Sequence, residues 1–407
     1  MHDWALLLFA VTYAGIALGH VPGLALDRTG IALLGAIAMV ATGVLPMGEA
    51  LASVSMPTIL LLYALMVVSA QLRLSGGYTA AAVAVSRLAG RPRLFLAILM
   101  GLSGALSALL VNDIVCLGFT PVVAVATLRA GLNPVPFLLG LAMASNIGSA
   151  ATIIGNPQNM LIGQVGHLGF ARFLAFCAPP SLLALAGAYG VLLRLYRGRL
   201  QTVVELSDSA GEDWPVLDRH QCRKGVLAVV LLIGLFFTPW PREFVALTVA
   251  AWLLASRQTA TRDLLGRVDW HLITLFCALF IVIRGLETTG VPEWLLAASR
   301  GAGFDPARPV GMALLSALLS NLVSNVPAVM LLVRFLDPGD PTAWYSLALA
   351  STFAGNLIVI GSIANLIVIE QAARHGIRIS FREHARAGIP VTLLSMAILL
   401  GWLALLR

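Results

Sequence analysis

Ser145-Asn-Ile-Gly-Ser-Ala-Ala-Thr-Ile-Ile-Gly-Asn-Pro-Gln-Asn159 interrupts a long apolar run, 134–165, with side chains and backbone groups that need hydrogen-bond partners. A second interruption, Gly355–Asn365, divides the apolar run 342–371 in the same way. Lipid offers no hydrogen bonds, so a broken helix persists at membrane depth only where protein buries it or where it lines a wet cavity. The two runs therefore predict two broken helices with a site beside them.

The composition of the chain points to a membrane protein. Of its 407 residues, 59% are hydrophobic and 11% are charged, and the mean hydropathy is +0.92. A soluble protein has roughly 25% charged residues, so a soluble enzyme, a nucleic-acid-binding domain and a disordered chain are excluded. The net charge of +7 comes from short basic clusters between apolar runs. The length allows about ten crossings at ~20 residues each.

The remaining apolar runs divide into two kinds. Eight are single candidate spans, at 4–20, 29–46, 57–74, 172–196, 222–239, 241–256, 269–286 and 387–406. Two others, 92–129 and 307–335, have a polar centre, and each is too long for one span and too short for two. Both predict re-entrant hairpins, in which two half-helices enter and leave on the same side.

The two halves of the chain resemble each other. Ser107–Asn112 matches Ser316–Asn321, and the matches within the two broken helices lie at a constant offset of 206, as for Asn159 and Asn365. Each half holds five spans and one hairpin; because five is odd, the second half must be inverted relative to the first. The predicted fold is an all-α polytopic membrane protein with two inverted repeats. The repeats are 1–196 (hairpin 92–129, broken helix 134–165) and 221–407 (hairpin 307–335, broken helix 342–371), joined by a linker, 197–220.

The distribution of basic residues predicts the orientation. Following the spans places 19 of the 26 Lys and Arg on one side of the membrane and the other seven on the opposite side. The basic side is cytoplasmic by the positive-inside rule. We therefore expect a plasma (inner) membrane protein with the linker 197–220 in the cytoplasm and both termini outside.

Asp113 is the candidate ion-binding residue. Of the 19 acidic residues it alone lies in the middle of a membrane-depth segment, where an isolated charge costs roughly 2.5–3.5 kcal/mol or more. It either binds a coupling cation or proton, or only ties the hairpin tip to its neighbour. The expected place for Na⁺ is the group Asn112, Asp113, Gly155, Asn321 and Gly361. Gly155 and Gly361 are interpreted as positions that need a small residue, with carbonyls that could coordinate.

The broken helices suit ions of both signs. Half-helix N-termini present N–H groups and partial positive charge to an anion, whereas C-termini and unwound carbonyls suit Na⁺. The sequence has no Walker lysine motif, so we expect neither an ATPase domain nor a cofactor beyond Na⁺ or H⁺ as coupling ion. No second acid, His or nucleophile accompanies Asp113 at depth, so we expect no enzyme. The four scattered Cys predict no metal site.

These residues resemble the ion transporter superfamily. Val111-Asn112-Asp113 leading to Thr120-Pro121, the two broken helices and Asn321–Ala328 carry the resemblance, which covers essentially the whole chain. The group includes arsenite efflux permeases, sodium/proton antiporters, citrate-transporter-like permeases and divalent-anion symporters. It implies a scaffold domain, a transport domain, homodimers and elevator-like alternating access.

The resemblance also implies the site residues. In the first half they are Asn112, Asp113, Asn146, Thr152, Gly155, Asn156 and Asn159, and in the second half Asn321, Ser324, Asn325, Asn356, Gly361, Ser362 and Asn365; Ser145, Ser149 and Gly355 lie in the same breaks.

The chain departs from the family pattern at two places. Ser145-Asn146-Ile147 and Ser324-Asn325-Val326 stand where dicarboxylate symporters have Ser-Asn-Thr motifs, which disfavours a dicarboxylate. Gly155-Asn156-Pro157 stands where arsenite permeases tend to have Gly-Asp-Pro, which alters the charge balance of a coupled cycle.

The leading hypothesis is a secondary active transporter of a small anion, an inorganic oxyanion or a carboxylate, coupled to Na⁺ or H⁺ through a site that includes Asp113. The alternatives are a Na⁺/H⁺ antiporter of the same fold, an arsenite efflux permease and, from another class, a passive channel. The expected partners are the lipid bilayer, the anion and a second copy of the chain, but no nucleic acid.

Overall fold

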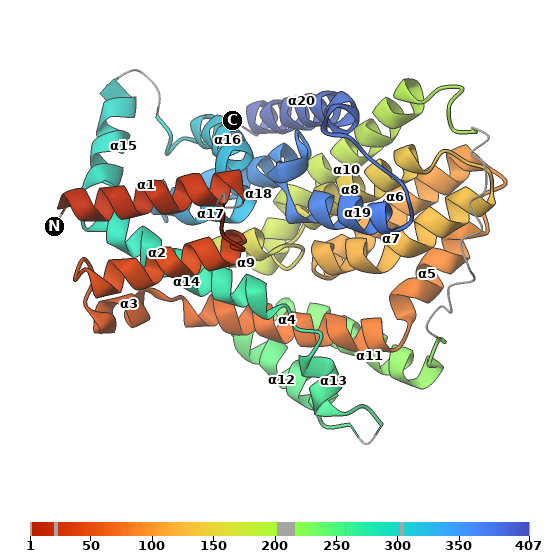
Figure 1. Ribbon diagram of the computed structural model, residues 1–407, viewed down its shortest axis with the longest axis horizontal. Coiled ribbons are helices and arrows are strands. Elements are labelled where there is room, and N and C mark those ends of the chain that lie inside the picture. Colours follow the sequence, from red (N-terminus) through yellow and green to blue (C-terminus); the bar gives the residue numbers. More distant parts are fainter. Residues whose placement is uncertain (1, 20–22, 202–215, 257, 302–304, 407) are drawn as a thin grey trace.

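The computed structural model describes residues 2–19, 23–201, 216–256, 258–301 and 305–406. Within these ranges the chain folds into helices, and the only extended pairing is an isolated bridge between Leu132 and Gln201 (Figure 1). The predicted all-α fold is confirmed. Most of the linker 197–220, residues 202–215, lies outside the described residues.

Ten helices precede the linker and ten follow it in the described part of the chain. The first ten are α1 (His2–Leu18), α2 (Arg28–Ala41), α3 (Met47–Ser53), α4 (Met56–Leu74), α5 (Gly77–Ser86), α6 (Pro92–Leu109), α7 (Asn112–Arg129), α8 (Pro134–Ser149), α9 (Pro157–Val165) and α10 (Phe170–Leu195). The others are α11 (Arg219–Phe236), α12 (Arg242–Leu254), α13 (Thr261–Leu265), α14 (Trp270–Glu287), α15 (Val291–Gly301), α16 (Pro309–Val323), α17 (Asn325–Leu332), α18 (Pro341–Ala354), α19 (Ile363–Arg374) and α20 (Phe381–Leu405), with short 3₁₀ turns η1 (Val333–Phe335) and η2 (Val359–Gly361).

Six of the described helices are long and apolar enough to cross a membrane. They are α4, α6, α7, α10, α14 and α20. The total of ten crossings stays a prediction. In the view of Figure 1, α4, α12 and α13 lie along the lower edge and α20 along the upper edge, with α8, α9, α18 and α19 between them. The broken helices thus occupy the middle of the protein.

The arms of the first predicted hairpin are longer than half-helices. The segment 92–129 forms α6 and α7, each of 18 residues. At 1.5 Å per residue each arm is about 27 Å long, close to the thickness of the hydrocarbon core. The second hairpin, 307–335, has unequal arms of 15 and eight residues, α16 and α17, followed by η1. Re-entrance of either hairpin stays a prediction.

The first broken helix follows from its local sequence. Every residue of α8 is buried, as expected of a helix that is apolar all round. The helix ends at Ser149, and α9 begins at Pro157, whose fixed φ and missing N–H suit a first helical position. The side chain of Asn156 caps α9 by accepting a hydrogen bond of 2.9 Å from the backbone N–H of Asn159.

The second broken helix is constructed in the same way. Nearly all of α18 is buried, and the chain leaves the helix after Ala354. Ser362 then caps α19 by accepting a hydrogen bond of 3.3 Å from the backbone N–H of Ala364. Each repeat therefore has a buried helix, a break in the α-helix, which in the second repeat contains η2, and a capped second helix.

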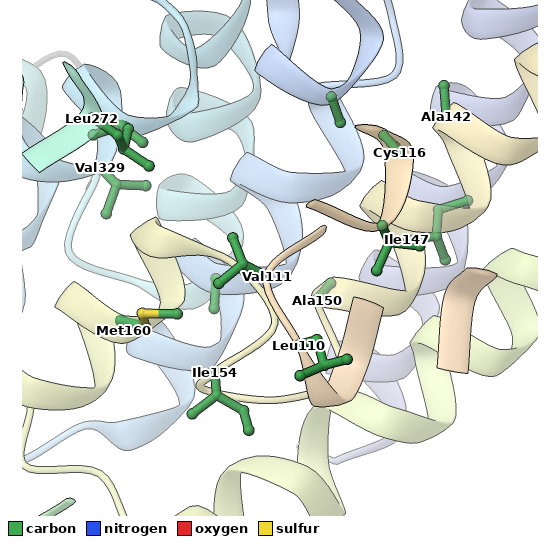
Figure 2. Packing of buried hydrophobic residues seen from close by; sticks show 14 of the residues in the cluster. Leu110, Val111, Cys116, Ala142, Ile147, Ala150, Ile154, Met160, Leu272 and Val329 are labelled. Atoms are coloured by element: carbon green, nitrogen blue, oxygen red, sulfur yellow. The ribbon is translucent and has the colours of Figure 1, made fainter. Parts of the chain in front are cut away.

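Close backbone packing holds each hairpin against its broken helix. A methyl group added to Gly148 of α8 would lie 2.2 Å from the carbonyl oxygen of Gly104 in α6, so only glycine allows this approach. Figure 2 shows apolar side chains of the loop before α7, Leu110 and Val111, in the same core cluster as Ile154 of the break. Because the tip of the first hairpin packs on the break, its position depends on the position of the break.

Candidate functional site

A small cavity lies where four helices begin. Its volume is about 20 Å³, which is room for about one water molecule. It is lined by Asn112, Asp113, Pro157, Gln158, Ser324, Asn325, Val326, Ser362 and Ile363. These residues belong to the first turns, or to the N-cap positions, of α7, α9, α17 and α19. Both hairpins and both broken helices therefore contribute a helix N-terminus to one point.

Backbone dipoles, and not basic side chains, contribute positive potential to this cavity. Each helix N-terminus carries a partial positive charge of roughly half a unit, which is strongest within the first turn. Side chains cap α9 and α19, whereas the N-caps of α7 and α17, Val111 and Ser324, make no side-chain cap hydrogen bond. No Lys, Arg or His is among the residues that line the cavity. Positive potential at this point comes from backbone dipoles.

Asp113 is the one charged side chain that lines the cavity. It is the second residue of α7 and is half-buried. Its carboxylate has neither an ion pair nor a hydrogen bond in the part of the chain that the structure describes. The hairpin tip is tied instead by its neighbour, because the backbone N–H of Asn112 donates to the carbonyl of Gly155 over 3.0 Å. This geometry favours the ion-binding hypothesis for Asp113 over the hypothesis of a structural tie.

Asn146 is the centre of the hydrogen-bond network behind the cavity. Its Nδ2 donates to Oδ1 of Asn356 over 2.9 Å and to Oδ1 of Asn365 over 3.2 Å. Its Oδ1 accepts from Ser362 Oγ over 2.9 Å and from Asn112 Nδ2 over 3.3 Å. One fully buried amide thus joins the first hairpin, the first broken helix and the second broken helix.

Asn159 and Asn365 close the breaks. The Nδ2 of Asn159 donates to the carbonyl of Thr152 over 2.9 Å, and the Nδ2 of Asn365 donates to the carbonyl of Ile358 over 3.3 Å. Each amide also donates to a second carbonyl three residues earlier. The two donor residues are 206 positions apart in the sequence, and so are the corresponding acceptor residues. These two side chains satisfy carbonyls that the break leaves without helical partners.

The alignment of the second hairpin with the first differs by four residues between the sequence match and the structure. Asn325, not Asn321, begins the second arm as Asn112 does in the first hairpin. In the orientation that satisfies both of its amide atoms, Asn325 donates to the carbonyl of Gly361 over 2.7 Å. Asn321 lies one turn earlier in α16 and donates to the carbonyl of Ala354 over 3.1 Å.

The corrected register makes Ser107–Asn112 the counterpart of Ser320–Asn325. Both segments begin with a buried Ser, have apolar residues at their third and fourth positions and end with the Asn that starts a helix. Ser324 at the second tip adopts a left-handed backbone conformation with φ of 76°, which costs a non-glycine residue of order 1–3 kcal/mol. The N-cap of α7, Val111, has a negative φ of −64°, so the two hairpin tips differ in backbone conformation.

The residues predicted from the sequence fall into two groups. Five line the cavity: Asn112, Asp113, Ser324, Asn325 and Ser362. The others support it from behind: Ser145, Asn146, Ser149, Thr152, Gly155, Asn156, Asn159, Asn321, Gly355, Asn356, Gly361 and Asn365. Of the supporting group, Asn159 Oδ1, Asn321 Oδ1 and Asn356 Nδ2 have no hydrogen-bond partner among the described residues. All three atoms are buried.

Sequence reasoning missed several residues of the site. Gln158 and Pro157 line the cavity, and Thr352 accepts hydrogen bonds from Asn156 and Gln158 at 3.3 and 3.4 Å. Thr352 stands 206 positions after Asn146, so the repeat offset would have identified it. Val326 and Ile363 also line the cavity, because they lie in the first turns of α17 and α19. Their apolar side chains do not distinguish them from other membrane-depth residues in the sequence.

Comparison with known proteins identifies relatives along nearly the full length. Residues 4–354 match the model of a family described as citrate transporter. An uncharacterized transporter of Mycobacterium tuberculosis is 30% identical over 97% of this chain and 96% of its own length. A silicon efflux transporter of Oryza sativa subsp. japonica is 29% identical over 96% of this chain and 95% of its own length.

Two further relatives extend the comparison. An arsenical pump membrane protein of Yersinia enterocolitica is 25% identical over 84% of each chain. The crystal structure of the YdaH transporter of Alcanivorax borkumensis superposes with a TM-score of 0.56 at 15% identity and covers 99% of this chain and 96% of that one. At that identity the likeness concerns the fold.

Proposed function

This chain belongs to the citrate transporter family and is a multi-pass membrane transporter, and we propose that it is a secondary active carrier of a small anion, coupled to Na⁺ or H⁺. The resemblance to the ion transporter superfamily is thereby confirmed, whereas the anion and the coupling belong to the proposal. The observation that carries it is the convergence of four helix N-termini on one cavity. That arrangement is suited to an anion, because N–H groups and aligned dipoles stabilise negative charge without a Lys or Arg.

Asp113 supplies the coupling in this proposal. An ionised carboxylate beside an anion opposes its binding, by about 4 kcal/mol for unit charges 4 Å apart at an effective dielectric constant of 20. Binding of H⁺ or Na⁺ at Asp113 removes this repulsion, so the cation and the anion bind cooperatively. The coupling is reciprocal by thermodynamic necessity, and the anion therefore raises the affinity for the cation.

The size and chemistry of the cavity support a small inorganic oxyanion over a larger carboxylate. A cavity of about 20 Å³ would have to open considerably to admit a tricarboxylate. The lining amides and hydroxyls, from Asn112, Gln158, Ser324, Asn325 and Ser362, suit oxygen atoms that act as both donors and acceptors. Relatives are named for silicon efflux and for an arsenical pump, which is consistent with small cargo.

The transport cycle that we propose is elevator-like alternating access in a homodimer. Its moving part would contain the hairpins and broken helices. Asn146 bonds the first hairpin to both broken helices, and Asn321 and Asn325 bond the second hairpin to its own broken helix. A unit tied in this way moves more readily as a body than by local rearrangement.

A Na⁺/H⁺ antiporter of the same fold is the second candidate. One observation favours it: Asp113 is the only ionisable side chain in the cavity and has no cationic partner among the described residues. In that mechanism Na⁺ and H⁺ would compete for the carboxylate, and the helix N-termini would only position the hairpin tips.

Electrical measurements on purified protein in liposomes distinguish the two candidates. On a solid-supported membrane, a sodium jump at fixed pH and a pH jump at fixed sodium are each given alone and then together with a panel of oxyanions and their weak acids: arsenite, silicate, phosphate, sulfate and citrate. The proposal predicts a transport current that requires an anion. A sodium-driven current without added anion, matched by an internal pH change, would instead establish the antiporter.

Asp113→Asn tests the coupling role directly. This variant keeps the shape of the side chain but cannot carry the charge, so transport should lose its dependence on the cation gradient. Asp263→Asn, which changes an exposed carboxylate far along the chain in α13, is the matched control. Unchanged ion dependence in a folded Asp113→Asn protein would contradict the role that we assign to Asp113.

A further inference from the structure

A broad groove lies between the beginning of α6 and the end of α10, away from the central cavity. Its volume is about 1040 Å³. It is lined by Arg91, Pro92, Arg93, Leu94, Gly190, Leu193, Arg194, Arg197, Gly198, Leu200 and Gln201. Four of these eleven residues are arginines and none is acidic. We call this surface the arginine groove.

The arginines of the groove have no acidic partner among the residues that the structure describes. Arg91, Arg93, Arg194 and Arg197 are exposed, and none of the four forms an ion pair within the described ranges. Such a concentration of positive charge is unfavourable unless an anion neutralises it. Guanidinium groups bind phosphate oxygens through paired N–H donors, so phosphate is the anion that this set of side chains matches best.

The two walls of the groove are held in place. Tyr189 of α10 donates a hydrogen bond of 3.1 Å from its hydroxyl to the carbonyl of Arg93 at the start of α6. This bond joins the walls close to the arginines. The groove is therefore a defined surface and not a chance approach of long side chains.

The position of the groove selects a membrane lipid over a soluble phosphate. Both α6 and α10 are long and apolar enough to cross the bilayer, and the groove lies at the ends of these two helices. The ends of a spanning helix lie at the level of the lipid headgroups. Leu94, which is 40% exposed, and Leu193 add apolar surface beside the charges. A phosphate that carries acyl chains would contact both kinds of surface, whereas free phosphate would contact only the arginines.

We propose that the arginine groove binds an anionic phospholipid with two phosphodiester groups, of the cardiolipin class. Two phosphodiesters carry two negative charges, and each can lie between two of the four guanidinium groups. Basic pockets between spanning helices on the cytoplasmic side are suited to such headgroups. The sequence predicts that this side of the protein is cytoplasmic, where Arg and Lys are concentrated. This site is separate from the transport site and does not depend on the proposed substrate.

Native mass spectrometry of purified protein tests the proposal. The protein is equilibrated with vesicles of phosphatidylcholine that contain a tenth of cardiolipin, and lipid adducts are counted after gentle removal of detergent. The wild type should retain cardiolipin. Replacing Arg91, Arg93, Arg194 and Arg197 together with Gln should lower the retained fraction by about tenfold or more, since each basic residue contributes on the order of 1 kcal/mol near an anionic lipid.

The matched control removes four other exposed arginines from the same predicted side, Arg262, Arg267, Arg378 and Arg382. It should retain cardiolipin as the wild type does. If both quadruple variants lose the same amount of cardiolipin, the loss reflects the overall positive charge of the protein, and the proposal is overturned. Full retention of cardiolipin by the groove variant would also overturn it. If the groove variant does not fold, the double variants R91Q/R93Q and R194Q/R197Q, one for each wall, replace it under the same criteria.

A separate experiment distinguishes binding of the lipid from binding of soluble phosphate. Wild-type protein loaded with cardiolipin is titrated with sodium phosphate at constant ionic strength, with sodium chloride as the reference. The proposal predicts that millimolar phosphate displaces no more lipid than chloride does. Displacement specific to phosphate, together with phosphate adducts that the groove variant lacks, would mean that the groove binds a soluble phosphate and that the lipid assignment is wrong.

Discussion

Ser362 Oγ donates a hydrogen bond of 2.9 Å to Asn146 Oδ1, and the same contact recurs with the two repeats exchanged. Adding the offset of 206 to Asn146 gives Thr352, and subtracting it from Ser362 gives Asn156. Asn156 Nδ2 does donate to Thr352 Oγ1, over 3.3 Å. Contacts that are reciprocal in this way are typical of a two-fold relation between units. The N-cap residue of each broken helix is thus held by the first helix of the other repeat.

Asn146→Ala should damage both stability and transport. The substitution removes the four hydrogen bonds of this amide and leaves buried partners, including Asn356 and Asn365, with unsatisfied groups. Each such group costs about 1–3 kcal/mol. We expect a melting temperature several degrees lower in detergent and a transport rate reduced by about tenfold or more, because 1.4 kcal/mol at the site is already tenfold.

Ser346→Ala provides the comparison for Asn146→Ala. Ser346 is as deeply buried, but its hydroxyl bonds only to the carbonyl of Thr342 in its own helix. Its loss should change the melting temperature far less. Similar effects of the two substitutions would mean that the network around Asn146 contributes no more than an ordinary buried hydroxyl.

Gly148→Ala should separate α6 from α8. The new methyl group would lie 2.2 Å from the carbonyl oxygen of Gly104 and 2.4 Å from its Cα, and backbone atoms cannot rotate away. Overpacking of this kind costs about 1–3 kcal/mol or more. Gly101→Ala in the same α6 meets nothing within 4 Å and should be neutral or stabilising by up to about 1 kcal/mol. Thermal unfolding in detergent measures both; equal stability of the two variants would contradict the packing argument.

Glu287→Gln should weaken an ion-pair cluster that connects α14 to the second hairpin. Glu287 lies 2.6 Å from Arg334 of η1 and 3.0 Å from Arg284, measured between carboxylate oxygen and guanidinium nitrogen. The two arginines are partly exposed, so we expect a loss of stability of roughly 1 kcal/mol at most, which salt should diminish. Melting temperatures at low and high sodium chloride test this expectation. A difference between wild type and variant that salt leaves unchanged would argue against an electrostatic role.

Labelling of single cysteines should reveal the predicted orientation. In a protein whose four Cys are replaced by Ala, Arg129→Cys lies on the predicted cytoplasmic side and Arg308→Cys on the predicted outer side, and both positions are exposed. A membrane-impermeant maleimide added to intact cells should react with the second variant only, and with both after permeabilisation. The reverse pattern would invert the topology and make the linker 197–220 external.

The class of protein and the positions of the breaks could be predicted from the sequence. An apolar excess over 407 residues admits only a membrane protein, and clusters of Asn, Ser, Gly and Pro within apolar runs indicate where helices stop. The caps are equally local: Asn156 precedes Pro157, and Ser362 precedes an apolar stretch, so the starts of α9 and α19 follow from neighbouring residues. These features depend on residues that are neighbours in the chain, which is why a single sequence reveals them.

The lengths and register of the hairpins depend on packing between distant segments. The sequence matches Asn112 with Asn321, because short segments of Leu, Ala and Ser align well in more than one register. The structure equates Asn112 with Asn325, because each is the first residue of the second arm. Each also donates to the carbonyl of a glycine in its own broken helix, Asn112 through its backbone N–H to Gly155 and Asn325 through its side-chain amide to Gly361. A contact with a carbonyl that lies 36 or more positions away leaves no trace in local patterns.

The site itself was decided by tertiary structure. The sequence alone determined which polar residues lie at membrane depth, since lipid tolerates them only in protein or beside water. Only the fold separates the residues that face the cavity, such as Asp113, from those that hold it together, such as Asn146 and Asn159. An amide can either bind a ligand or satisfy a broken helix, and the choice depends on which unpaired carbonyls and amides lie within hydrogen-bond distance after folding.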